Sequence, residues 1–305
     1  MPVTLGVGSA RPASHDVPLS IVKSPRAALR TLLTGRPDGA APWISAMAEP
    51  GDDGWFGPAS TAWRVHADPA TLVGGIRALL VQAMHPTVLA GFDVHSDYRE
   101  DPTDRLQRTA AFVTVTTFGS SEQAAAACER VRRVHRPVRG TTDGGVQYDA
   151  SDPELLGWVH VALVDSLAES VRRYGTTRFD LDSYLAETAV VGEWLQAANV
   201  PGSAADLRET YAHYVPSLAV TSATFPAHRF ILDPPLPWQM RPAYKVLAAA
   251  AVASMPAELA GLMAARPAIP PAPAAVVGRA ATRLVGAILG GSPAAAAAAR
   301  RRPAS

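Results

Sequence analysis

Cysteine and lysine are both scarce in this chain of 305 residues. Cys128 is the single cysteine, so the sequence contains no disulfide pair, no thiolate zinc or iron–sulfur cluster and no CxxCH haem attachment. Lys23 and Lys245 are the only lysines among 28 basic residues. A bias of this kind can arise from genomic base composition alone. A cluster of arginines is therefore weaker evidence for function here than in an average sequence.

Strong net charge and long apolar runs are also missing. Hydrophobic residues make up 48% of the chain, charged residues 18%, and the net charge is +1. This composition predicts a globular protein that does not bind nucleic acid through general charge. The longest apolar stretch, 246–265, contains Pro256 and Glu258 and is too interrupted for a bilayer span. It could be core, dimer interface or peripheral membrane contact, and the oligomeric state stays open.

Several catalytic motifs do not occur in the sequence. There is no HExxH, no Glu-x-x-His, no GxSxG, no P-loop and no GxGxxG followed by a helix. The adjacent glycines of "VGGIRALL" indicate close helix packing rather than phosphate binding. These absences argue against a zinc protease, a ferritin-like di-iron protein, a hydrolase, a kinase and a nicotinamide-dependent enzyme. Residues 1–20 also contain no export signal, and we expect a cytoplasmic protein.

Helix signals recur along the chain, whereas strand alternation is scarce. Asp-Pro pairs at 68–69, 101–102 and 152–153 suit helix starts, and Gly119 and Gly175 suit helix ends. The pattern predicts an all-α single domain over residues 21–290. A disordered lead over 1–20 and a low-complexity basic tail over 291–305 flank this domain. The expected helices are about 69–84, 102–118, 121–138, 153–174, 181–197, 204–213, 241–264 and 274–289.

The helix expected over 121–138 contains the stretch "VRRVHRPVRG". Helical spacing puts His135 on the apolar stripe and turns the arginines to solvent. We expect Ser120 and Gln123 to form a capping box at the start, and Pro137 to kink the helix near Arg133. His135 is then either a core histidine bonded to a neighbour or a ligand of a metal or haem. A nucleic-acid face is a weaker third alternative, because no aromatic residues interleave with the arginines.

The helix expected over 102–118 carries arginine and threonine on one face, with apolar residues beyond them. Arg105, Arg108 and Thr109 share this face. A buried arginine needs an anionic partner. That partner is either a nearby carboxylate (Asp97, Glu100 or Asp101) or a ligand carboxylate such as a haem propionate, in which case the Thr109 hydroxyl can bond to a bound ligand.

The helix expected over 153–174 is apolar nearly all round between Leu155 and Leu167, as a central core helix is. His160 and Asp165 are its polar exceptions. His160 is either a satisfied core histidine or a second residue facing the cofactor pocket of His135. His85 and His95 are expected in loops at the rim of the same pocket.

Five segments together resemble the MpaB/latex-clearing (rubber) oxygenase family, DUF2236, over about residues 50–290. They are "WRVHADPATLVGGIRALLVQAMHPTVLAGF", "HSDYREDPTDRLQRTAAFVTVTTFG", "RVHRPVRG", "YDASDPELLGWVHVALVDSLAESVRRYG" and "PPLPWQMRPAY". The resemblance implies a mainly helical, partly globin-like fold that holds a non-covalent haem b. It assigns His135 as the proximal iron ligand, and Arg105 and Thr109 as residues of the pocket helix.

The resemblance also implies chemistry and partners. Rubber-cleaving members carry a lysine where this chain has Arg108, and an arginine cannot take the lysine's place as a sixth haem ligand. We expect a haem-dependent oxygenase that uses dioxygen on an apolar intracellular small molecule, such as an isoprenoid, lipid or secondary metabolite, with oxidative C=C cleavage as the family reaction. Asp97 and Glu100 are the candidate bases. The alternatives are a haem-binding peroxidase or sensor, and a metal-free helical lipid-binding or scaffold protein.

Overall fold

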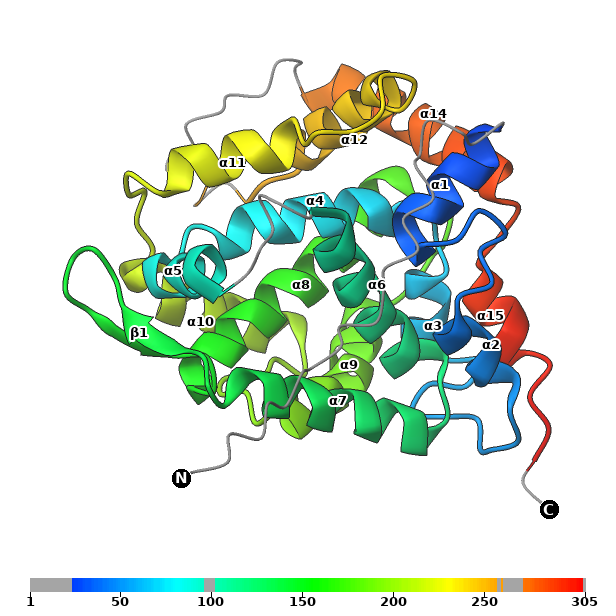
Figure 1. Cartoon of the computed structure of the whole chain (residues 1–305), viewed down its shortest axis with the longest axis horizontal. Helices are drawn as coiled ribbons and strands as arrows, with labels where there is room; N and C mark the ends of the chain where they lie inside the picture. The colour runs from blue at the N-terminus through cyan, green and yellow to red at the C-terminus, as the bar shows by residue number, and fades with distance from the viewer. Residues whose placement is uncertain (1–23, 96–101, 257–258, 260–270, 304–305) are drawn as a thin grey trace, which may run out of the picture.

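The computed structural model describes residues 24–95, 102–256, 259 and 271–303. It is a single helical domain with one short β-hairpin (Figure 1), which confirms the all-α prediction. All the expected helices occur, and their observed bounds are α4 (Thr71–Gln82), α6 (Pro102–Phe118), α7 (Ser121–His135), α8 (Pro153–Tyr174), α9 (Leu181–Leu195), α10 (Ala204–Tyr214), α12 (Arg241–Ala253) and α14 (Pro271–Leu289).

Further elements were not expected from the sequence, mostly because they are short. They are α1 (Pro25–Thr34), α2 (Pro42–Ser45), η2 (Ala46–Ala48), α3 (Thr61–His66), α5 (Pro86–His95), η3 (Val215–Ser217), α11 (Thr224–Leu232), α15 (Pro293–Ala298), β1 (Arg139–Thr141) and β2 (Gln147–Asp149). The helix expected over 69–84 ends before Pro86, and Pro86 is the first residue of α5. Proline suits a first turn, where its missing N–H is not needed.

Two expected helices end early. α7 stops at His135, so Pro137 lies beyond the helix and does not kink it near Arg133. α12 stops at Ala253, and the helix expected to reach 264 is broken before Pro256. The capping box of α7 is confirmed: Gln123 N donates to Ser120 Oγ at 3.2 Å, and Ser120 N donates to Gln123 Oε1 at 3.0 Å. Asp152 also caps α8 as expected, accepting from Glu154 N at 2.9 Å.

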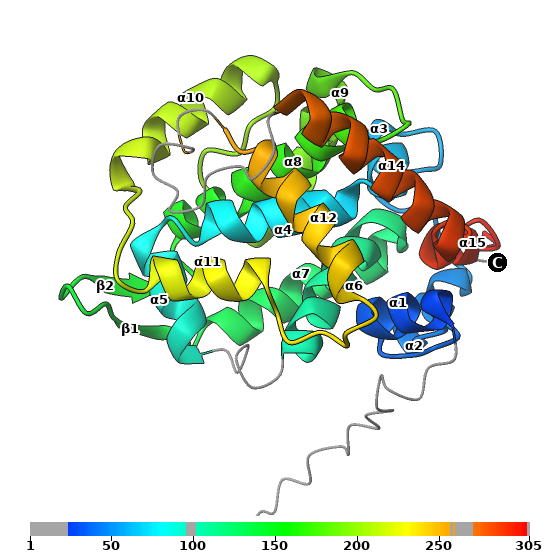
Figure 2. The same ribbon diagram turned by 90° about the horizontal axis from the view of Figure 1, so that it is seen from above.

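The core is built on the pairing of α4 with α8, which cross the middle of the molecule (Figures 1 and 2). Gly74 permits this close approach, because a Cβ there would lie 2.9 Å from the backbone of Leu167. The indole of Trp158 is fully buried and donates to Gln82 O at 3.4 Å. The expectation that "VGGIRALL" packs closely against another helix is confirmed, and so is the central position of α8.

The other helices cover this pair on different sides. α12 packs on α4 and α14, and Figure 2 shows α11, α12 and α14 in one layer over α4. α9 and α10 pack on α8, while α6 and α7 form an antiparallel hairpin with α7 against α9. From α12, the buried residues are Leu247, Ala248, Ala250, Ala251 and Val252. The described part of the apolar stretch 246–265 is therefore mainly core.

The C-terminal residues also pack on the domain. α15 contributes Ala294, Ala297 and Ala298 to a second apolar cluster with Ile44, Trp63 and Phe118. Arg301 donates to the carbonyl oxygens of Met47, Asp52 and Phe118. The basic end of the chain thus ties α15 to the start of the domain.

Within the described residues, no single helix is both long and apolar enough to cross a membrane. The pair Thr71–Gln82 and Pro86–Val94 meets the length and composition criteria together, but it is bent by 104°.

Candidate active site

The arginine–threonine segment of the sequence analysis lies on α6, and the histidine lies on α7. α6 ends at Phe118 and α7 begins at Ser121, and the two helices pack against each other. Arg105 lies near the start of α6 and His135 at the end of α7, so each is near the helix end that is far from the connecting turn. Arg105 and His135 therefore lie on adjacent helices at the open end of the hairpin.

His135 is the last residue of α7 and is half-buried. The stripe that contains it begins with Ala124 and Cys128, which are both buried. Burial raises the pKa of the Cys128 thiol to about 12, so this cysteine stays protonated. The predicted orientation of α7 is confirmed, since Arg130, Arg133 and Arg136 are exposed on the opposite side.

The β-hairpin fixes the chain directly after His135. Val138 N donates to His135 O at 2.8 Å, and Ala150 N donates to Val138 O at 2.9 Å. Arg139 then pairs with Asp149 across the two strands, at 2.7 Å. The buried Tyr148 ring packs over Gly140 of β1 and Gly91 of α5, where a larger side chain would meet the ring. These contacts restrict the backbone that carries the imidazole, so the position of His135 is set before any ligand binds.

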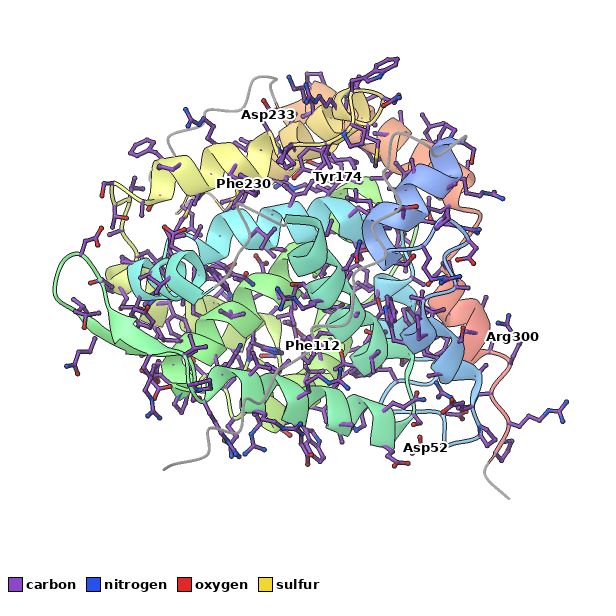
Figure 3. All side chains as sticks on the ribbon, in the orientation of Figure 1. Asp52, Phe112, Tyr174, Phe230, Asp233 and Arg300 are labelled. Atoms are coloured by element: carbon purple, nitrogen blue, oxygen red, sulfur yellow. The ribbon has the colours of Figure 1, made fainter. Side chains whose placement is uncertain are left out.

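The α6 side of the hairpin differs from the buried arginine face expected from the sequence. Arg108 and Thr109 are exposed, and the side chain of Arg105 lies outside the described residues. The expectation that Arg108 is buried is therefore wrong, because the polar face of α6 turns outward at this level. Residues 110–115 of α6 are half-buried. Among them, Phe112 lies between the ribbons of α6 and α7 in the view of Figure 3.

His160 is deeply buried on α8, with 5% of its surface exposed. Burial lowers the pKa of its imidazole to about 4, so the ring is neutral at physiological pH. Its Nε2 is enclosed and has no hydrogen-bond partner. The ring packs at Gly192 of α9, where a Cβ would lie 3.3 Å from its Cδ2. The contacts of His160 are thus with α9, and no described contact joins it to His135.

The structure describes the surroundings of His85, but not the side chains of the other residues expected near the pocket rim. His85 is buried between α4 and α5, its Nδ1 lies 2.9 Å from Thr87 Oγ1, and its ring packs near Trp158. His95 is the last residue of helix α5 rather than a loop residue, and its side chain is not described. Asp97, Glu100 and Asp101 lie outside the described residues.

The structure contains two hydrogen-bonded clusters of polar side chains that the sequence analysis did not identify. Arg77 of α4 donates to Asp165 and Ser166 of α8, each at 2.7 Å, and Tyr211 of α10 donates to the same carboxylate at 2.7 Å. His66 of α3 bonds to Thr117 at 2.6 Å and to Tyr184 at 3.0 Å. Asp165 was singled out as polar on an apolar helix, but its partners are too distant in sequence for any spacing rule.

Within the described residues, no cluster of three or more His, Cys, Asp or Glu side chains is arranged to hold a metal ion. A ligand set of this kind is not needed for a haem, whose porphyrin supplies four nitrogens to the iron, so that one histidine from the protein is enough.

Comparison with known families identifies the class of protein. Residues 63–287, from α3 into α14, match the family described as "ER-bound oxygenase mpaB/B'/Rubber oxygenase, catalytic domain". The match covers most of the chain and confirms the resemblance found in the sequence. This helical domain therefore belongs to a family of oxygenases, which places it among the oxidoreductases. No curated protein and no solved structure matched the chain in the corresponding comparisons.

Proposed function

We propose that this chain is a haem-dependent oxygenase that acts on an apolar small molecule. Family membership supports oxygen chemistry in general. The observation that supports the finer proposal is that α6, which carries Arg105 and Thr109, packs against α7, which carries His135. A histidine on one helix and arginine and hydroxyl groups on the next are the side chains that a haem pocket uses.

The chemistry of these residues fits a haem b. An imidazole is a common protein ligand of haem iron, and the half-buried His135 lies on a stripe with apolar residues. Guanidinium groups bind carboxylates through paired hydrogen bonds, so Arg105 of α6 suits a haem propionate.

Each residue of the hairpin then has a distinct role. His135 would bind the iron, and the β-hairpin holds the backbone that carries its ring. Arg105 would orient a haem propionate or dioxygen, and Thr109 would offer its hydroxyl as a hydrogen-bond donor there. A guanidinium is a poor iron ligand, so Arg108 would not act as the lysine of the rubber-cleaving members does. Haem, when bound, supplies the activation of dioxygen.

We propose that His160 faces the cofactor and does not bind the iron. Its neutral ring is enclosed on α8, and its unpartnered Nε2 is a group that a buried polar ligand atom or water would satisfy. Its ring also lies against Gly192 of α9.

The half-buried side chains of Ala110, Phe112 and Val113 supply apolar surface beside the proposed pocket. This surface favours an isoprenoid, lipid or other apolar metabolite over a charged substrate. Oxidative C=C cleavage is the reaction proposed by analogy with the rubber oxygenases of the family name. The cytoplasmic location and the domain limits stay predictions.

Absorption spectroscopy of protein expressed with iron and a haem precursor tests the proposal. We expect a Soret band that disappears in His135→Ala and survives in His160→Ala. Haem content, measured after extraction, gives the same comparison independently of activity. A colourless protein under these conditions would overturn the assignment and favour a metal-free lipid-binding or scaffold protein.

Oxygen consumption with lipids and terpenoids separates an oxygenase from a haem peroxidase or sensor. We expect consumption with an apolar substrate, reduced strongly in Thr109→Val while the Soret band is retained. Haem binding with no oxygen consumption on any apolar substrate would instead identify a peroxidase or sensor.

A further inference from the structure

We infer that the layer formed by α11, α12 and α14 docks on an anionic lipid surface. Figures 1 and 2 show these three helices together along one side of the molecule, over α4. This layer is distant in sequence from the α6–α7 hairpin. Lipid binding by its surface does not depend on the proposed haem chemistry.

α14 carries an apolar stripe on its outward side, next to the exposed Arg279 and Arg283. Ala274, Gly278 and Val285 are buried against the domain, as expected for a packed helix. On the opposite side, an exposed apolar stripe follows helical spacing. Its residues are Val276, Ala280, Leu284 and Ala287. A surface helix of a globular protein normally carries polar residues on this face. Val276 is 66% exposed and Leu284 62% exposed.

Apolar exposure extends beyond α14. Trp238, in the segment between α11 and α12, is 75% exposed, and Phe225 on α11 is 52% exposed. A cavity of about 160 Å³ lies between α12 and α14. Small apolar residues such as Val277 line it, together with the basic Lys245. Exposed tryptophan beside basic groups is typical of proteins that bind at the membrane interface.

The charges of this layer are almost all positive. Within the described part of the segment 224–289, the only acidic residue is Asp233, which Figure 3 labels in this layer. The basic residues of the same part are exposed, and they are Arg229, Arg241, Lys245, Arg279 and Arg283. Arg279 and Arg283 flank the apolar stripe of α14. A surface that combines apolar residues with a one-sided positive border is complementary to anionic lipid headgroups.

The same charges disfavour a second copy of this chain as the occupant. A two-fold interface places the same patch of each subunit against the other, so the arginines would face arginines. Like charges across an interface are costly. An anionic lipid surface has no such conflict.

Vesicle sedimentation with the purified full-length protein tests the inference. We expect binding to phosphatidylcholine vesicles that contain about a quarter phosphatidylglycerol, and weaker binding to phosphatidylcholine alone or at high salt. Each arginine near an anionic surface contributes about a fivefold affinity. The double variant Arg279→Gln/Arg283→Gln is therefore expected to bind at least about tenfold more weakly, and Leu284→Asp to lose most of its binding.

Matched controls change the same residue types elsewhere. Val146→Asp at the β-hairpin turn and Arg208→Gln on α10 alter exposed residues and are expected to bind as the unchanged protein does. Equal thermal midpoints for all variants would show that folding is intact. Three results would each overturn the inference: no vesicle binding, binding without preference for anionic lipid, or α14 variants that bind like the controls. A dimer that Leu284→Asp converts to a monomer, without vesicle binding, would identify the face as a subunit interface.

Discussion

The imidazole of His66 accepts a hydrogen bond from the phenol of Tyr184, with Nε2 3.0 Å from the hydroxyl oxygen. Its other nitrogen, Nδ1, lies 2.6 Å from Thr117 Oγ1, and the single hydroxyl proton of Thr117 is donated to Val113 O at 2.6 Å. Nδ1 must therefore carry the ring proton, which leaves Nε2 as the acceptor. This chain of bonds joins α3, α6 and α9.

Removing the phenol hydroxyl of Tyr184 should leave the Nε2 of His66 without a donor. We expect Tyr184→Phe to lower the free energy of unfolding by about 1–3 kcal/mol, the usual cost of an unsatisfied buried polar group. Chemical denaturation measures this difference. The exposed His213→Gln serves as the control and should change stability by less than about 0.5 kcal/mol. Equal stability of Tyr184→Phe and the unchanged protein would contradict the proposed bond chain.

Lowering the pH should destabilise the protein at pH values well above those at which carboxylates titrate. Burial lowers the pKa of His66 and His160 to about 4, below the value near 6.5 of an exposed histidine. As the pH falls through about 6.5, the unfolded state takes up protons that the folded state does not. The free energy of unfolding therefore falls between about pH 6.5 and 4, by about 3 kcal/mol for His160 and less for the half-buried His66.

Thermal unfolding followed at several pH values checks this dependence. The slope should become shallower in His160→Asn, because that variant removes one of the histidines whose pKa is lowered by burial, which also include His66, His85 and His228. A melting temperature that stays constant from pH 7 to 4.5 would show that none of these histidines is held neutral by burial.

The ion pair between Arg77 and Asp165 should matter far more than an exposed pair. Arg77 is 2% exposed and lies 2.7 Å from the carboxylate, whereas both members of the pair Arg36–Asp38 are 53% exposed. We expect Asp165→Asn to cost about 3–5 kcal/mol, since it leaves a buried guanidinium without its counter-charge. Asp38→Asn should cost less than about 1 kcal/mol. Denaturant midpoints compare the two, and similar losses in both variants would refute this difference.

The two adjacent glycines of α4 provide a matched pair of substitutions. A Cβ at Gly74 would lie 2.9 Å from Leu167 Cα and from Ser166 O, whereas a Cβ at Gly75 meets nothing within 4 Å. We expect Gly74→Ala to destabilise the protein by about 1–3 kcal/mol through overpacking. Gly75→Ala should be neutral or stabilising by up to about 1 kcal/mol, because alanine favours the helix. The opposite order of stabilities would refute the close packing of α4 on α8.

Local sequence signals were enough for most of the helical framework. Ser120 with Gln123, and Asp152 with Pro153, marked the starts of α7 and α8 because capping depends on residues a few positions apart. The same signals failed for short elements such as α3 and α11, whose few turns give too little periodicity. They also failed to fix the end of α7, where Pro137 terminates the helix at His135 rather than bending it.

The sequence by itself determined the all-α class, the orientation of α7 with its arginines outward, and the family to which the chain belongs. Each depends on spacing or on motif order within the chain. Tertiary structure alone decided that Arg77 pairs with Asp165, that His66 bonds to Tyr184, and that the polar face of α6 turns Arg108 outward. It also decided that α14 presents apolar residues on both faces. These features depend on which helices pack together, and residues far apart in the chain leave no periodic pattern that reports such contacts.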